Sequence, residues 1–143
     1  LEDSSLPVGG NNTHTVLTGH RGLPSSKLFT RLDELKKGDL FFIKVIDETL
    51  AYKINKIEVV LPDKVSYSII DNQDLASLIT CTPYGLNTHR LVITGKRVPY
   101  KKKEKKSIKS SMPSLREIIF YVIPVLFSVA GILFFRKRGV KNV

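Results

Sequence analysis

The chain has 143 residues, with 23 Lys and Arg against 13 Asp and Glu, a net charge of +10 and a single cysteine, Cys81. This length holds one modest domain, and one cysteine excludes both an internal disulfide framework and a cysteine-rich zinc module. Residues 1–100 carry 12 basic and 11 acidic side chains, whereas residues 101–143 carry 11 and 2. A nucleic-acid reader spreads basic side chains over a folded face, so this distribution argues against nucleic acid as a partner.

Five segments of the first hundred residues predict β-strands, because each is rich in β-branched, aromatic or other apolar residues between Gly, Pro, Asn or Asp. They are Thr13–Gly19, Leu40–Ile46, Leu50–Leu61, Ala76–Cys81 and Arg90–Gly95. The three residues Asp47-Glu48-Thr49 join the second and third strands with a length that suits a hairpin. So many strands predict a mainly β fold, either a barrel or a sandwich.

Two shorter elements are also expected in this region. Leucines recur at helical spacing in Leu28–Leu35, with serines before them to cap the helix and Gly38 after them to stop it. The segment Ser66–Ile70 is a candidate for one additional short strand.

The C-terminal part divides by composition into a basic linker at 101–114, an apolar stretch at 115–135 and a basic tail at 136–143. At about 1.5 Å per residue, the apolar stretch would span about 31 Å as a helix, close to the ~30 Å hydrocarbon core of a bilayer. We therefore expect a domain at 1–100 followed by a single C-terminal transmembrane helix. Basic residues flank both ends of this helix, so the positive-inside rule leaves its orientation open.

Cys81 is the candidate nucleophile, and a thiol needs a neighbouring base or cation to react as thiolate. It ends a predicted strand and enters a loop, from which an antiparallel strand returns beginning at Arg90. Cross-strand neighbours have Cβ atoms about 4.5–5.5 Å apart, close enough for Arg90 to act beside the sulfur or beside an oxyanion formed on it. Since His89 and Arg90 point to opposite faces of the strand, only one of them faces Cys81, and the residues alone leave open which.

The histidines differ in their surroundings. His20 follows a predicted strand, between Gly19 and Gly22, where its imidazole can lie at a rim as an acid or base. His14 lies inside the strand and is interpreted as structural. The three histidines and Cys81 lack the close ligand pairs typical of metal sites, so neither a metal nor another cofactor is expected.

Three separated motifs, taken together, favour a catalytic role for some of these candidate residues. They are SSLPVGG at Ser4–Gly10, LTGHRGLP at Leu17–Pro24 and LITCTPYGLNTHRL at Leu78–Leu91. In this order and at these distances they resemble the sortase family, most closely the class C, pilin-polymerising sortases, over about Ser4–Tyr100.

The resemblance implies a cysteine transpeptidase in which Cys81 is the nucleophile, His20 the acid and base, and Arg90 the group that stabilises the oxyanion. Such enzymes attack the Thr–Gly bond of a Leu-Pro-x-Thr-Gly (LPxTG)-like sorting signal, form a thioester with the new carboxyl end and transfer it to an amine. In class C the amine is a lysine of a pilin subunit. The implied partners are therefore proteins bearing sorting signals, pilin subunits among them, and the membrane.

The family fold is an eight-stranded β-barrel, preceded by a membrane segment and, in class C, by a lid over the active site. About two strands of that barrel would fall before Leu1, so we expect a sortase-like barrel that is incomplete, with a short helix. Ser77 stands where the family usually has a threonine, and it keeps the hydroxyl. Class C members commonly carry a C-terminal membrane helix, which would place the catalytic domain outside a Gram-positive cell and 136–143 in the cytoplasm.

Three alternatives remain open. The chain could be a catalytically inactive, truncated sortase-like binding module, or a sortase that anchors surface proteins to peptidoglycan. A surface protein with its own sorting signal would need a Thr-Gly pair before the apolar stretch, and Met112-Pro113-Ser114-Leu115 lacks it.

Overall fold

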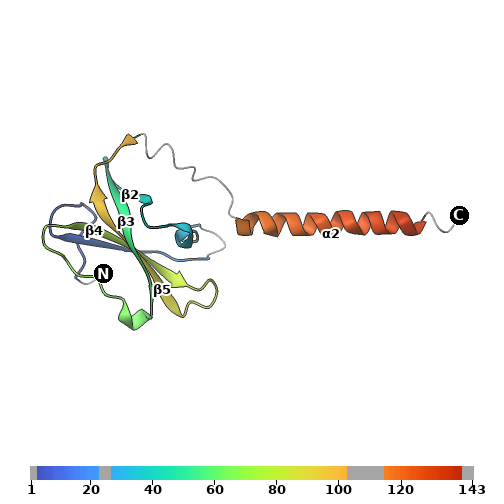
Figure 1. Ribbon diagram of the computed structural model, residues 1–143, viewed down its shortest axis with the longest axis horizontal. Helices are drawn as coiled ribbons and strands as arrows, with labels where there is room; N and C mark the ends of the chain where they lie inside the picture. The colour runs from blue at the N-terminus through green and yellow to red at the C-terminus, as the bar shows by residue number, and fades with distance from the viewer. Residues whose placement is uncertain (1–2, 23–26, 103–114, 140–143) are drawn as a thin grey trace. The chain divides into compact units, whose positions relative to one another are not determined.

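The computed structural model describes residues 3–22, 27–102 and 115–139, with the side chains of the last range described from 118 to 134. The chain divides into two compact units, 1–102 and 103–143. The elements in chain order are β1 (Thr13–Thr18), η1 (Leu32–Glu34, a 3₁₀ turn), β2 (Leu40–Val45), β3 (Glu48–Val60), η2 (Pro62–Lys64, a 3₁₀ turn), β4 (Asp74–Thr82), β5 (His89–Val98) and α2 (Leu115–Gly139) (Figure 1).

All five predicted strands are present and form one sheet in the order β1-β4-β5-β3-β2. The β1 strand pairs parallel with β4, while the other three pairings are antiparallel. The interior strand β4 is buried along most of its length, as expected for a strand covered on both faces. The protein is therefore mainly β, and β4 lies between the strands that carry the other candidate site residues.

The structure corrects three local predictions. Val45 pairs with Glu48, so the β2–β3 loop consists of Ile46 and Asp47 and begins earlier than expected. Ile46 has a φ of 52°, the left-handed conformation that two-residue hairpin loops require. The predicted helix at 28–35 is instead a turn at 28–31 followed by the 3₁₀ turn η1, and Ser66–Ile70 is not a strand.

The helix prediction failed for a tertiary reason. The Phe29 backbone N–H donates to the His20 carbonyl at 3.1 Å, so this chain segment is tied to the end of β1 instead of closing a helical turn. Helices of this length are marginal by themselves, and no side chain hydrogen-bonds the start of η1. Leu32 is nevertheless buried and Leu35 packs against the core, whereas Leu28 is exposed, so the leucine pattern marked the core-facing residues only in part.

Apolar side chains pack on both faces of the sheet, following the two-residue period of its strands. The larger cluster consists of Leu32, Phe41, Ile43, Leu50, Tyr52, Ile54, Ala76, Leu78, Leu91 and Ile93. A smaller cluster on the other face of β4 and β5 is built around Val16, Ile79 and Val92. Both clusters pack against β4 and β5, and Cys81 lies near the end of β4.

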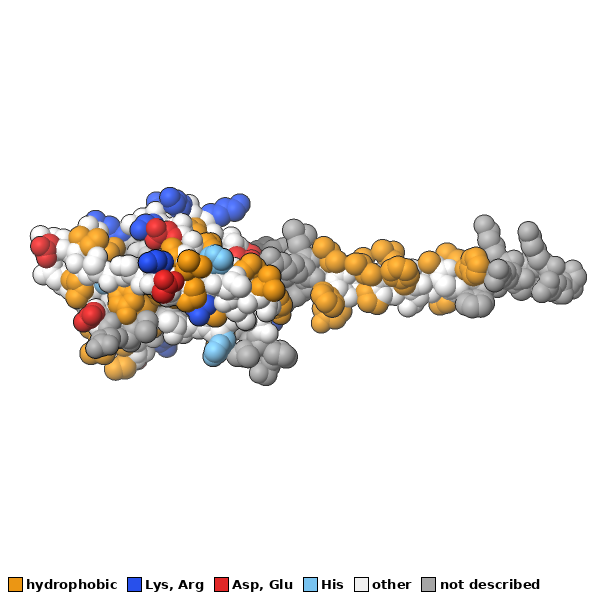
Figure 2. All heavy atoms as spheres, turned by 90° about the horizontal axis from the view of Figure 1, so that it is seen from below, with side chains coloured by type: hydrophobic (Ala, Val, Ile, Leu, Met, Phe, Trp, Pro, Cys, Tyr) orange, Lys and Arg blue, Asp and Glu red, His pale blue; other side chains and the backbone are white. Residues whose placement is uncertain are grey.

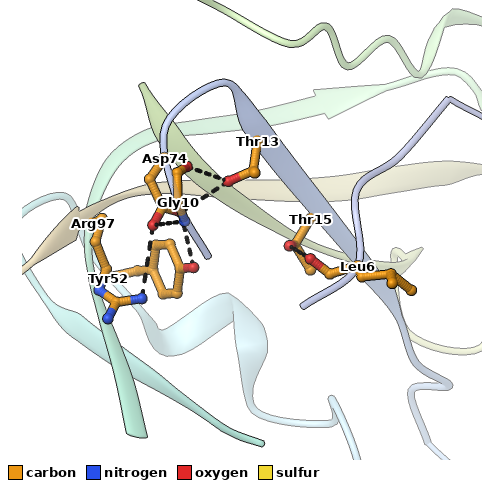
Figure 3. A network of polar contacts seen from close by, with 7 residues as sticks. All are labelled: Leu6, Gly10, Thr13, Thr15, Tyr52, Asp74 and Arg97. Atoms are coloured by element: carbon orange, nitrogen blue, oxygen red, sulfur yellow. Dashed lines mark hydrogen bonds and ion pairs between the residues drawn. The ribbon is translucent and has the colours of Figure 1, made fainter. Parts of the chain in front are cut away.

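A polar network joins the segment before β1 to three strands (Figure 3). The carboxylate of Asp74 accepts hydrogen bonds from the Gly10 backbone N–H at 2.8 Å and the Tyr52 hydroxyl at 3.0 Å. Arg97 lies 3.7 Å from the same carboxylate, and its guanidinium stacks over the Tyr52 ring. At Thr15, the hydroxyl donates to the Leu6 carbonyl, so the N-terminal segment is fixed at a second point.

Burial raises the pKa of Tyr52 to about 12, and this shift predicts a loss of stability at high pH. The phenol ionises near 10 in the unfolded chain, so its stabilising effect is complete below pH 10 and declines as pH rises towards 12. Urea unfolding of the full chain between pH 8 and 11.5 should show this decline, and Tyr52→Phe should lack it. Tyr84→Phe, at an exposed tyrosine, is the control. Equal pH slopes for the parent chain and Tyr52→Phe would contradict the prediction.

The α2 helix is 25 residues long and contains Pro124, whose carbonyl accepts a hydrogen bond from Ser128 at 2.9 Å. Most of its described apolar side chains are exposed, and they coat the helix in Figure 2. Within the side chains that the structure describes, no helical stretch is both long and apolar enough to cross a membrane. The transmembrane assignment of 115–135 therefore stays a prediction.

Candidate active site

The candidate nucleophile and the candidate oxyanion group lie directly opposite each other. In the antiparallel β4–β5 pair, Cys81 is the register partner of Arg90, as the sequence predicted, and Thr82 is the partner of His89. Cys81 and Arg90 are both partly exposed, so a substrate could reach them. The Arg90 guanidinium donates to the carbonyls of Asn87 and His89 at 3.2 and 3.1 Å, which orients it at the mouth of the loop.

His20 reaches the same place through the parallel pairing of β1 with β4. The ladder ends at Thr18 opposite Ile79, and the Gly19 N–H then donates to the Ile79 carbonyl at 3.1 Å. The Thr80 hydroxyl donates back to the Gly19 carbonyl at 2.7 Å. Gly19 therefore still lies beside β4, at Thr80. This places His20, the next residue, close to Cys81.

A pocket of about 190 Å³ opens where these strands end. Its lining consists of Thr18, Gly19, His20, Ile79, Thr80, Cys81 and Arg90. Residues that bear an imidazole, a thiol and a guanidinium thus line one cavity, although His20 is about sixty positions from Cys81 and about seventy from Arg90. This is the combination that attack on an acyl carbon requires: a sulfur nucleophile, an acid or base, and a donor for the developing oxyanion.

Two glycines beside His20 are required by close packing. A Cβ on Gly19 would lie 2.7 Å from the Phe29 ring, and one on Gly22 would lie 2.6 Å from the Tyr84 ring. Gly22 also has a φ of 83°, which favours glycine. These contacts pack the loop after β1 against Phe29, which precedes η1, and against Tyr84 of the β4–β5 loop. The sequence showed the glycines but not the aromatic partners that require them.

The other two histidines lie elsewhere. His14 is buried, with Nδ1 2.8 Å from the Ser68 carbonyl and Nε2 2.8 Å from the Ser77 hydroxyl, as expected for a structural residue. His89 is paired with the Thr88 hydroxyl and does not line the pocket. Of the two candidates, Arg90 and not His89 is therefore the neighbour of Cys81. The hydroxyl that Ser77 keeps is used in the structure, where it joins His14 to Thr94.

Across residues 3–22, 27–102 and 115–139, no group of three or more His, Cys, Asp or Glu side chains is placed to hold a metal ion.

The known proteins that this chain is similar to are sortases. The sortase domain family matches residues 1–98. Sortase C of Streptococcus pneumoniae is 53% identical with a TM-score of 0.68, over 70% of this chain and 53% of that one. Sortase C1 of Streptococcus agalactiae is 49% identical with a TM-score of 0.70, over 75% and 56%. Sortase A of Bacillus anthracis is 31% identical over 89 residues, which are 62% of this chain and 42% of that protein.

The chain spans about half the length of these relatives, and its sheet corresponds to part of the sortase fold. Its solved structural neighbours are class C sortases at about 50% identity. Because the domain match covers more than half of its residues, the chain belongs to the sortase family.

Proposed function

We propose that the protein is a cysteine transpeptidase that cleaves an LPxTG-like sorting signal and transfers the new carboxyl end to an amine. The observation that carries this proposal is the shared pocket of His20, Cys81 and Arg90. Sortases are cysteine transpeptidases, and the site residues of the family fall on these positions by motif.

In the first half-reaction, the Cys81 thiolate attacks the threonine carbonyl carbon of the substrate, and the carbonyl electrons move to oxygen. Arg90 donates to this oxyanion, for which a permanently charged guanidinium with several fixed donors is well suited. As the intermediate collapses, the C–N bond breaks, and protonated His20 gives its proton to the leaving glycine amine. The product is a thioester on Cys81.

In the second half-reaction, an amine attacks the thioester carbon and His20 takes a proton from it. The new C–N bond forms, the C–S bond breaks and the Cys81 thiolate returns. We propose a pilin lysine as the amine, because the neighbours are class C sortases, and the S. pneumoniae structure is described in terms of pilin substrate specificity. A peptidoglycan amine would use the same chemistry.

Intact-mass spectrometry of the full chain with an LPxTG peptide tests the transpeptidase. We expect the mass of the chain to rise by that of the peptide's acyl group up to and including the threonine, bound as a thioester. Adding a lysine-bearing pilin peptide or a peptidoglycan-type amine should then identify the acceptor from the mass of the product. A folded chain that forms no adduct would favour the inactive binding module.

We also propose that α2 anchors the protein in the membrane of a Gram-positive cell, with the catalytic domain outside. This rests on the sequence, since 118–135 carries no charge and basic residues flank it. Carbonate-washed membranes should retain the full chain and lose the Leu126→Arg, Val129→Arg double variant.

Because Cys81 is the single thiol, labelling of intact cells by an impermeant maleimide reports directly on which side of the membrane Cys81 lies. Recovery of the parent chain in the soluble fraction would contradict the proposal.

A further inference from the structure

We propose that Arg21 is a positioning residue that, with Asp33 and Thr82, holds the two sides of the pocket in their reactive arrangement; this inference rests on the proposed function. Arg21 directly follows His20, and Thr82 directly follows Cys81. The Arg21 guanidinium donates to the Thr82 hydroxyl at 3.1 Å and to the Asp33 carboxylate at 2.5 Å. One side chain therefore joins the segment that carries the imidazole to the segment that carries the thiol.

The burial of this contact separates it from an ordinary surface ion pair. The Arg21 side chain is 3% exposed and that of Asp33 is 27% exposed. A buried guanidinium is costly unless it is paired and hydrogen-bonded, and the Arg21 Nε has no partner within the described part of the chain. Apolar side chains could hold two loops together without this cost, so a charged fork here indicates a need for defined geometry.

Defined geometry is needed here because the pairing of β1 with β4 ends before His20. The β1–β4 ladder stops at Thr18, and the backbone contacts of Gly19 are the last between the two strands before His20. The position of the imidazole relative to the sulfur therefore depends on contacts beyond the ladder. The Phe29 N–H fixes the His20 carbonyl, and the Arg21 fork supplies the link to the Cys81 side.

Asp33→Asn removes the negative charge that pairs with one arm of the fork, and Thr82→Val removes the hydroxyl that accepts from the other arm, while Arg21 keeps its charge. We expect kcat for acyl-enzyme formation to fall about 10- to 100-fold with little change in KM, as for small misplacement of reacting groups. Thr82→Ser keeps the acceptor hydroxyl and should retain most of the rate. Glu34→Gln is the matched control, because Glu34 lies beside Asp33 on η1 and forms an exposed ion pair with Arg31.

A second measurement does not depend on sorting-signal turnover. The rate of Cys81 alkylation by iodoacetamide, followed against pH in the full chain, reports how the groups around the sulfur favour its thiolate. The pH of half-maximal alkylation should move in Asp33→Asn and Thr82→Val but not in Glu34→Gln or Thr82→Ser. If the parent chain forms no peptide adduct while this shift is present, the proposed function fails and the positioning role stands.

Unchanged alkylation profiles in Asp33→Asn and Thr82→Val would overturn the positioning role, whatever the peptide result. A lower melting temperature in these variants with an unchanged profile would mean that the fork is only structural, and would overturn it as well. Because each variant leaves at least one acceptor for the Arg21 guanidinium, both are expected to fold, and circular dichroism checks this.

Discussion

Replacing Cys81 with alanine is expected to abolish the peptide adduct completely, because no other thiol in the chain can form a thioester. Intact-mass spectrometry of parent and variant under the same conditions measures this loss. The fold should persist, since Cys81 is only partly buried and belongs to neither apolar cluster.

His20→Ala should lose the adduct almost as completely, because both proton transfers of the proposed mechanism depend on that ring. His89→Ala is its matched control, at a histidine beside Arg90 that does not line the pocket. An adduct that persists in Cys81→Ala would refute the nucleophile assignment. A loss in His89→Ala as large as in His20→Ala, with the fold intact, would mean that the imidazole is wrongly assigned.

Arg90→Lys is expected to lower kcat by about 10²- to 10³-fold while peptide binding persists, the effect typical of losing an oxyanion donor. Lysine keeps the positive charge but not the planar fork of donors, and its ammonium cannot reproduce the fixed orientation of Arg90 against the Asn87 carbonyl. Single-turnover acylation and peptide affinity, measured separately, distinguish the two effects. Arg31→Lys, at a surface arginine directly before η1, should leave turnover unchanged.

An Arg90→Lys variant with the parent turnover would contradict the oxyanion role. Weaker binding at an unchanged kcat would instead make Arg90 a substrate-binding residue.

Where neighbouring chain segments decide the geometry, the sequence was sufficient. The five strands follow from β-branched and aromatic runs between turn residues, and their bounds agree closely with the structure. The Cys81–Arg90 pair was also predictable, because a short loop returns β5 antiparallel to β4 and thereby defines the register. The histidines could be ranked only through the motif that surrounds His20.

The tertiary structure decided what depends on distant segments. The helix expected at 28–35 shrank to η1 because Phe29 bonds the end of β1, a contact that no local pattern encodes. His20 reaches the pocket only because β1 pairs in parallel with a strand about sixty residues away. Likewise, Arg21 follows His20 as an ordinary charged residue in the sequence, and burial between Asp33 and Thr82 is what makes it a candidate for positioning the site. Local propensity acts within a few residues, whereas an active site is assembled where separate segments pack together.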